Sequence, residues 1–179
     1  RTIHPQAAAL MADYLGTDLA KVANEVEKLI LNVPAAQEIQ AIHIEQNIGI
    51  SKDFNVFELQ SALAKRNATK AIQIVDYFAA NPKSNPMPLV IGTLGGYFTK
   101  LLKYHYLPDK SPQNAAKVMG VHAFFLKEYE MAARNFNRRK VFDIIHQLSS
   151  YDLKSKGLDV GPNTSSGDIL REMVFKILN

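Results

Sequence analysis

The chain has 179 residues, of which 47% are hydrophobic and 21% are charged, and this balance excludes a disordered segment because it supplies enough apolar surface for a packed core. The sequence contains no cysteine, which excludes disulfides and thiolate zinc sites and is typical of a reducing, cytoplasmic compartment. The net charge of +4 is uneven, because residues 1–50 carry three basic and six acidic residues whereas residues 51–179 carry 18 and 11.

The beginning of the chain, RTIHPQ, includes neither an initiator Met nor the apolar stretch of a signal peptide. We therefore expect the chain to be the middle of a longer protein. No apolar run approaches the ~20 residues of a membrane span, so no membrane association is expected. The charge difference between the two parts predicts a domain boundary near residue 50. A basic surface on the longer part suits DNA or an acidic protein, but a charge this mild is more often an ordinary solvated surface and does not identify a nucleic-acid binder.

The first part of the chain predicts a small unit of three helices. A helix over residues 6–15 ends at Gly16, and the next begins after a cap at Thr17 or Asp18. The third is short, over residues 44–48. The second helix shows an apolar stripe at helical spacing that is expected to face inward, namely Leu19, Val22, Ala23, Val26, Leu29 and Ile30.

The second part of the chain predicts a larger helical bundle. Residues 49–54, GISKDF, are predicted as a linker, and Asn55 with Glu58 has the spacing of a capping box that opens the next helix. The remaining helices are expected at about 67–81, 88–106, 112–119, 123–135, 138–158 and 168–178. We therefore expect an all-α protein, with a three-helix domain over residues 1–48 and a helical bundle over residues 55–179.

Motifs for catalysis, cofactors or metals are not found in the sequence. There is no GxxxxGK[ST] phosphate loop, no GxSxG elbow and no HExxH pair, and the carboxylates are scattered. Of the five histidines, His43 and His122 stand where helices are predicted to begin, which favours capping or surface roles. The cluster Gly92, Gly95 and Gly96 lies within a predicted helix and indicates a close helix–helix approach or a kink. We expect no catalytic, cofactor-binding or metal-binding residue.

One basic cluster is the candidate binding site. Arg134, Arg138, Arg139 and Lys140 surround a predicted helix joint, RNFNRRK, in which Phe136 is interleaved. These cations either form a solvated helix end or contact DNA phosphates or an acidic neighbouring subunit. A weaker group consists of Lys100, Lys103 and Lys110. The aromatic residues expected mainly in the core, with a surplus that points to subunit contacts, are Tyr97, Phe98, Tyr104, Tyr106, Phe124 and Phe125.

An ordered series of segments resembles one known family. The series is LGTDLAKVANEVEKLIL (15–31), NVFELQSALAKRNATKAIQIVDYF (55–78), PMPLVIGTLGGYFTKLLKYH (86–105), VHAFFLKEYEMAARNF (121–136) and SSYDLKSKGLD (149–159). In this order the segments resemble the C-terminal lid and collar regions of bacterial DNA polymerase III delta subunits, the clamp-loader subunits that open the sliding clamp.

This resemblance implies a cytoplasmic, non-catalytic component of the replication machinery. The collar would assemble with the other clamp-loader subunits so that the clamp is loaded on primed DNA, and the sliding clamp would be bound by an N-terminal domain outside this chain. The alternative is a free-standing helical nucleic-acid-binding domain that uses the basic cluster. Steep weakening of DNA binding with salt, in the absence of partners, would distinguish that alternative. A helical enzyme is disfavoured because no catalytic constellation is present.

Overall fold

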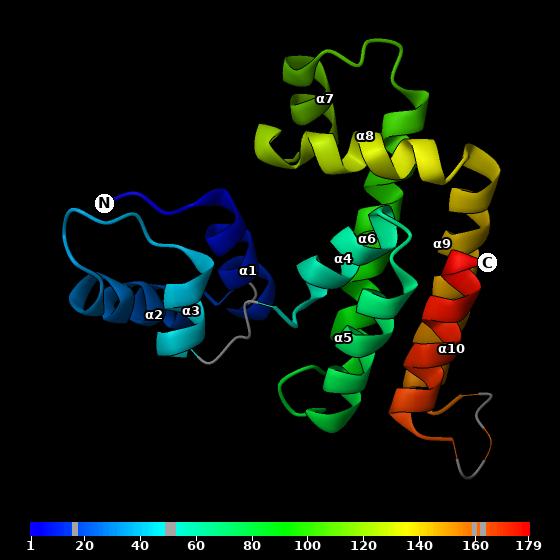
Figure 1. Ribbon diagram of the computed structural model, residues 1–179, viewed down its shortest axis with the longest axis horizontal. Coiled ribbons are helices and arrows are strands. Elements are labelled where there is room, and N and C mark those ends of the chain that lie inside the picture. Colours follow the sequence, from blue (N-terminus) through cyan, green and yellow to red (C-terminus); the bar gives the residue numbers. More distant parts are fainter. Residues whose placement is uncertain (16–17, 49–52, 159–160, 162–163) are drawn as a thin grey trace. The chain divides into compact units, whose positions relative to one another are not determined.

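The computed structural model describes residues 1–15, 18–48, 53–158, 161 and 164–179. These residues fold into two compact units, Arg1–Asn55 and Val56–Asn179, each of which is described by itself (Figure 1). Both units are built from helices, and the only β-type pairing in the described part of the chain is an isolated bridge between Ile3 and Ile39. The predicted all-α class is therefore confirmed.

The N-terminal unit contains α1 (Pro5–Leu15), α2 (Leu19–Asn32) and α3 (Ala41–Ile48). The isolated bridge ties the segments that precede α1 and α3, because the His4 N–H donates to the Ile39 carbonyl at 2.8 Å. The side chain of Asp18 caps α2 by accepting from the N–H groups of Ala20 and Lys21. The core of the unit is formed by Ala7, Leu10, Met11, Leu15, Leu29, Val33, Ile39 and Ile44.

The apolar stripe predicted on α2 is buried only in part. Leu29 is fully buried, whereas Leu19 is 81% exposed and Ile30 is 39% exposed. A unit this small has too little apolar surface to cover the whole stripe, so the prediction of an inward face is wrong at its edges. The start of α3 also differs, because His43 lies in its first turn, where Nδ1 accepts the Gln40 N–H at 3.0 Å. Predictions on residues 16, 17 and 49–52 lie outside the described residues.

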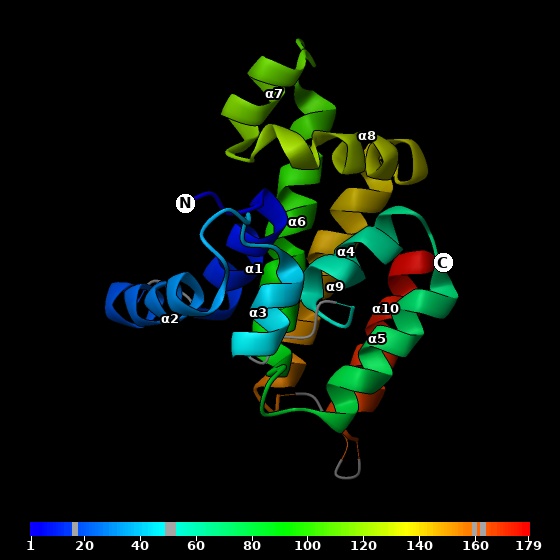
Figure 2. The same cartoon turned by 60° about the vertical axis from the view of Figure 1, so that its left-hand side comes forward.

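The C-terminal unit is a bundle built on two pairs of helices. Its elements are α4 (Val56–Ala64), α5 (Ala68–Ala80), α6 (Met87–Tyr106), α7 (Pro112–Met119), the 3-10 turn η1 (Ala123–Phe125), α8 (Leu126–Asn135), α9 (Arg138–Ser155) and α10 (Ser166–Leu178). Helix α6 packs along α9, and α5 packs along α10, while α4 and α8 contact α6 (Figures 1 and 2). The largest fully buried side chains of this unit are Leu59, Leu63, Ile74, Phe78, Leu94, Phe98, Leu101, Phe136, Ile144 and Leu170.

Local signals in the sequence account for most of the helix ends. The Asn67 side chain caps α5, and Ser165 and Asp168 form a capping box that starts α10 two residues earlier than predicted. Gly120, with φ of 63°, ends α7 in the left-handed conformation. The segment predicted as one helix from residue 123 begins as a 3-10 turn, in which the Phe125 N–H donates to the His122 carbonyl at 3.0 Å and the side chain of His122 accepts the Phe124 N–H at 3.2 Å.

The close helix approach expected at the α6 glycines does not occur there. A Cβ atom built on Gly92, Gly95 or Gly96 would meet nothing within 4 Å, apart from the helix's own backbone. The close contact lies instead at Gly167 of α10, where a Cβ atom would come within 2.7 Å of the Ala79 Cβ atom of α5. Helix propensity alone does not separate these positions, because the contact depends on which helices pack together.

Candidate functional site

The predicted basic cluster lies at the joint between α8 and α9. Arg134 belongs to the last turn of α8, and Arg138, Arg139 and Lys140 form the first turn of α9. The first turn of α9 contains no acidic residue. Three cations therefore share the positive end of a helix dipole, an arrangement that opposes helix formation by about 0.3–1 kcal/mol for each exposed cation. The sequence thus keeps positive charge where local helix energetics disfavour it.

The four cations of the cluster differ in their surroundings. Arg134, Arg138 and Arg139 are exposed. Lys140 is half-buried, and its Nζ donates to the carbonyl of Lys176 at 3.1 Å, so it fastens the start of α9 to the end of α10. We therefore assign Lys140 a structural contact and regard the three arginines as the cations available to a ligand.

Phe136, which is interleaved with the basic residues, is an anchor in the core. It is fully buried, its ring packs edge-to-face on Phe98 at a centroid distance of 5.9 Å, and the Arg66 guanidinium carbon lies 5.5 Å from its centroid. Its carbonyl accepts a hydrogen bond from Nε2 of His105 at 2.8 Å. These contacts fix the joint, and Asn137 then caps α9 by accepting the Lys140 N–H. The exposed arginines consequently project from a fixed joint between α8 and α9. We call Arg134, Arg138 and Arg139 at this joint the basic corner.

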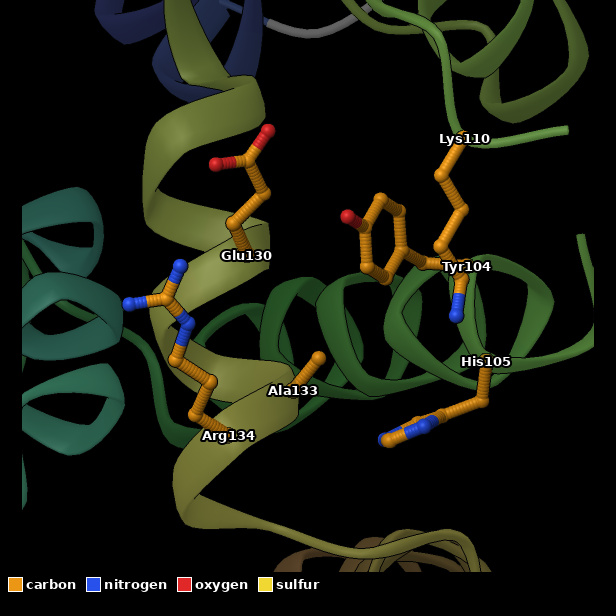
Figure 3. A pocket seen from close by; sticks show the side chains of 6 residues that line it. All are labelled: Tyr104, His105, Lys110, Glu130, Ala133 and Arg134. Atoms are coloured by element: carbon orange, nitrogen blue, oxygen red, sulfur yellow. The ribbon is translucent and has the colours of Figure 1, made fainter.

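A shallow groove of about 280 Å³ adjoins this corner (Figure 3). It is lined by Tyr104, His105, Lys110, Glu130, Ala133 and Arg134. In Figure 3, Glu130 and Arg134 project from α8 on one side, Tyr104 and His105 project from α6 on the other, and the Arg134 guanidinium turns away from Tyr104. Lys110 lies over Tyr104, with Nζ 5.3 Å from the ring centroid. Two permanent cations and one carboxylate therefore give the groove a net positive charge.

The phenol of Tyr104 stays neutral in this groove. Burial raises the pKa of Tyr104, the charge of Glu130 raises it further, and the charge of Arg134 opposes both. A neutral phenol offers one donor and one acceptor, so the groove presents hydrogen-bonding groups as well as cations. This chemistry suits a ligand that carries both negative charge and polar edges.

Two exposed aromatic rings flank Arg138. Tyr106, at the end of α6, is 66% exposed, and its ring centroid lies 5.5 Å from the Arg138 guanidinium carbon. Phe142, one helical turn after Arg138 on α9, is 62% exposed. Of the aromatic residues expected mainly in the core, Tyr97, Phe98 and Tyr104 are buried, whereas Tyr106 and Phe124 are exposed and form part of the expected surplus. They lie on helix faces turned to solvent.

Sequence reasoning missed Phe142 and Arg66 as parts of this region. A signal for Phe142 is present in the sequence, because Val141, Ile144, Leu148 and Tyr151 define the inward face of α9 and leave Phe142 outside it. Arg66 has no such signal. Its φ of 53° and the hydrogen bond from its guanidinium to the Leu178 carbonyl follow from the turn between α4 and α5.

Inside the C-terminal unit, Glu128 lies beside two stacked tyrosines. Burial raises the pKa of Glu128, against smaller opposite effects of a hydrogen bond with Ser61 and the charge of Lys65. The rings of Tyr97 and Tyr129 stack with centroids 4.9 Å apart, and burial followed by the charge of Glu128 raises the pKa of both phenols. Because burial makes ionisation of these three side chains unfavourable in the folded state, their protonation is coupled to the stability of the unit.

The described residues offer neither a grouped set of metal ligands nor a membrane-spanning helix. Within residues 1–15, 18–48, 53–158, 161 and 164–179, no three His, Asp or Glu side chains are grouped so that they could hold a metal ion. No helix in the same residues combines the length and the apolar character needed to cross a bilayer.

The fold and the site define an all-α helical-bundle protein with a basic, aromatic corner. Residues 53–165 match the family described as DNA polymerase III delta subunit, C-terminal domain. Because this match covers more than half of the chain, the chain belongs to that family, and the resemblance seen in the sequence is confirmed.

One solved structure is similar over nearly the whole chain. It is the Bacillus subtilis DNA clamp loader delta protein (YqeN), with a TM-score of 0.62 and 22% sequence identity. The similarity covers 99% of this chain and 51% of that one, so the chain spans about half the length of the Bacillus protein. No curated protein sequence matches the chain significantly.

Proposed function

We propose that this chain is the lid and collar region of a clamp-loader delta subunit and that it serves DNA replication without catalysing a reaction itself. The observation that carries the proposal is the family match over residues 53–165, which falls almost entirely within the compact unit Val56–Asn179. That unit is the proposed collar, residues 1–48 are the proposed lid, and residues 49–54 join them. The proposed compartment is the cytoplasm.

The collar is proposed to assemble with other loader subunits through apolar surface. An assembly that persists while ATP is bound and hydrolysed elsewhere needs contacts that do not depend on nucleotide. Such an interface should bury at least ~1,000 Å² around an apolar centre. The large apolar side chains that the unit exposes to solvent include Leu89, Val118, Met131, Leu153 and Phe175.

ATP binding and contact with the sliding clamp are assigned to parts of the clamp loader other than this chain. The sequence has no phosphate-binding loop, so ATP binding of that kind is expected in other subunits. Contact with the sliding clamp is assigned to an N-terminal domain outside this chain, as the family resemblance implies. This chain would then hold the subunit in the loader while other parts engage the clamp.

A pull-down tests the proposal. The purified chain is offered the other loader subunits and the sliding clamp of the same organism, without ATP. We expect capture of loader subunits and no capture of the clamp. Tight binding to the clamp with no binding to loader subunits would overturn the assignment of lid and collar.

The basic corner favours a second candidate function, that of a free-standing nucleic-acid-binding domain. Arg134, Arg138 and Arg139 are exposed beside a cationic groove. In this case the chain would bind DNA without any partner, and its affinity would fall steeply with salt concentration. Binding of loader subunits, as tested above, separates the two candidates.

A further inference from the structure

The basic corner combines stacking surfaces with positive charge, and each has its own structural source. The stacking surfaces are the rings of Tyr106 and Phe142, which are 66% and 62% exposed. They come from different helices, α6 and α9, which pack along each other. The Arg138 guanidinium carbon lies 5.5 Å from the Tyr106 ring centroid, and Phe142 follows Arg138 by one turn of α9.

The positive charge comes from side chains and from the helix itself. Arg138 and Arg139 occupy the first turn of an 18-residue helix, where the backbone N–H groups have no partner within the helix. The Asn137 side chain accepts the N–H of Lys140, and Lys140 itself reaches the Lys176 carbonyl. The backbone N–H groups of the two arginine residues therefore point out of the start of α9, and the same turn carries their guanidinium groups. A bound anion would relieve their mutual repulsion.

The groove extends this charge away from α9. Tyr104 and His105 line it and directly precede Tyr106, and Lys110 and Arg134 supply its two permanent cations. Glu130 is the acidic residue among its lining side chains. The groove therefore adds two cations to the same unit, and one of them, Arg134, belongs to the last turn of α8, just before the α8–α9 joint.

We propose that this corner binds a short segment of single-stranded nucleic acid, with bases stacked on Tyr106 and Phe142 and phosphates at Arg138, Arg139 and the groove. Bases stack on exposed aromatic rings only when they are unpaired, and binders of single strands combine such rings with a positive track. A duplex would satisfy the arginines and leave both rings unused. An acidic peptide would also need cations but not two exposed rings beside them. The inference narrows the second candidate function to single strands, and it does not rest on the clamp-loader proposal.

Fluorescence anisotropy with labelled oligonucleotides tests this inference on the 179-residue chain. The probes are oligo-dT and oligo-rU of about 12 nucleotides, in the range of known single-strand site sizes, a duplex of the same length and a poly-glutamate peptide. With about four cations engaged, the logarithm of affinity should fall with the logarithm of salt concentration with a slope of about −3, or roughly 50-fold between about 50 and 200 mM. A preference for dT identifies DNA as the ligand, and a preference for rU identifies RNA.

Charge and stacking are separated by two kinds of variant. Arg138→Gln with Arg139→Gln should weaken binding at least tenfold at low salt and make the salt slope shallower by about 1.4. The matched control, Lys83→Gln with Lys156→Gln, removes the same charge at the other end of α6 and α9 and should bind like the unmodified chain. Tyr106→Leu should weaken binding by about tenfold with an unchanged salt slope, and Tyr106→Phe should keep the affinity because the ring remains.

Several results would overturn the inference. They are stronger binding of poly-glutamate or of the duplex than of both single strands, equal losses in the arginine and control variants, and no loss for Tyr106→Leu. Poly-glutamate binding that needs Arg138 and Arg139 would assign the corner to an acidic protein. The pull-down of loader subunits is repeated with the arginine variant. If the arginine variant loses oligonucleotide binding but still captures loader subunits, the site is supported. The clamp-loader proposal is judged only by whether the unmodified chain captures loader subunits.

Discussion

The same substitution, glycine to alanine, should change stability in opposite directions at two positions of the C-terminal unit. Gly96 lies on the exposed side of α6, and a Cβ atom there would meet nothing within 4 Å. Gly96→Ala should therefore raise the free energy of unfolding by about 0.5–1 kcal/mol, the difference in helix propensity. In contrast, the Cβ atom added by Gly167→Ala would lie 2.7 Å from the Ala79 Cβ atom, so α5 and α10 must move apart.

The expected loss at Gly167 follows from overpacking. Extra methyl groups in well-packed contacts cost about 1–3 kcal/mol, which exceeds the gain of up to ~1 kcal/mol from replacing a helical glycine. We therefore expect a net loss of about 1–2 kcal/mol. For a chain of this size each kcal/mol corresponds to about 2–4 °C in Tm. Gly167→Ala should thus lower the Tm by roughly 2–8 °C, and Gly96→Ala should raise it by roughly 1–4 °C.

Thermal unfolding followed by circular dichroism measures both changes, with denaturant titration as a check on the free energies. The double variant Gly167→Ala with Ala79→Gly serves as the control, because removal of the Ala79 Cβ atom takes away the contact. It should recover part of the stability lost in Gly167→Ala. Shifts of the same sign for Gly96→Ala and Gly167→Ala, or no recovery in the double variant, would refute the described packing of α5 against α10.

Three further predictions concern single side chains and the basic corner. Because burial raises the pKa of Glu128, its ionisation opposes folding. Stability should therefore fall as pH rises from the ordinary glutamate pKa of 4.5 through the raised pKa. Glu128→Gln should flatten this pH dependence of the free energy of unfolding, measured by unfolding curves at several pH values. Asn137→Ala removes the cap of α9 and should lower the free energy of unfolding by about 0.5–2 kcal/mol in denaturant titrations, whereas Asn137→Ser should restore most of it. Charge reversal by Arg138→Glu with Arg139→Glu should abolish oligonucleotide binding. Helical content measured by circular dichroism should stay unchanged or rise slightly, because acidic residues are favourable in the first turn of a helix.

The helices were predictable from sequence because their signals are local. Apolar spacing, the helix start at Asn67 and the helix end at Gly120 are properties of neighbouring residues, so the sequence predicts most helix bounds to within a few positions. The sequence-based predictions are wrong where tertiary contacts determine the structure. The close contact at Gly167 and the exposure of Leu19 depend on which helices pack together and on how much surface each unit can cover.

The candidate site was predictable only in its contiguous part. Three arginines and Lys140 lie within seven residues of sequence, so the sequence alone predicts the cluster. The groove was not visible, because Tyr104, Lys110 and Arg134 meet only when α6 and α8 pack together. The separate roles of Lys140, which contacts α10, and Arg138, which stacks on Tyr106, likewise depend on packing. Spacing along a chain does not specify such long-range pairs.

The assembly role is the central claim, and sedimentation velocity of the chain mixed with purified loader subunits tests it most directly. The mixtures are run with and without ATP, and the sliding clamp replaces the loader subunits in a parallel run. Our account predicts a complex with loader subunits that sediments equally in both conditions, because the proposed contacts are apolar and independent of nucleotide. A complex that forms only with the clamp, with the loader subunits sedimenting separately from the chain, would contradict it.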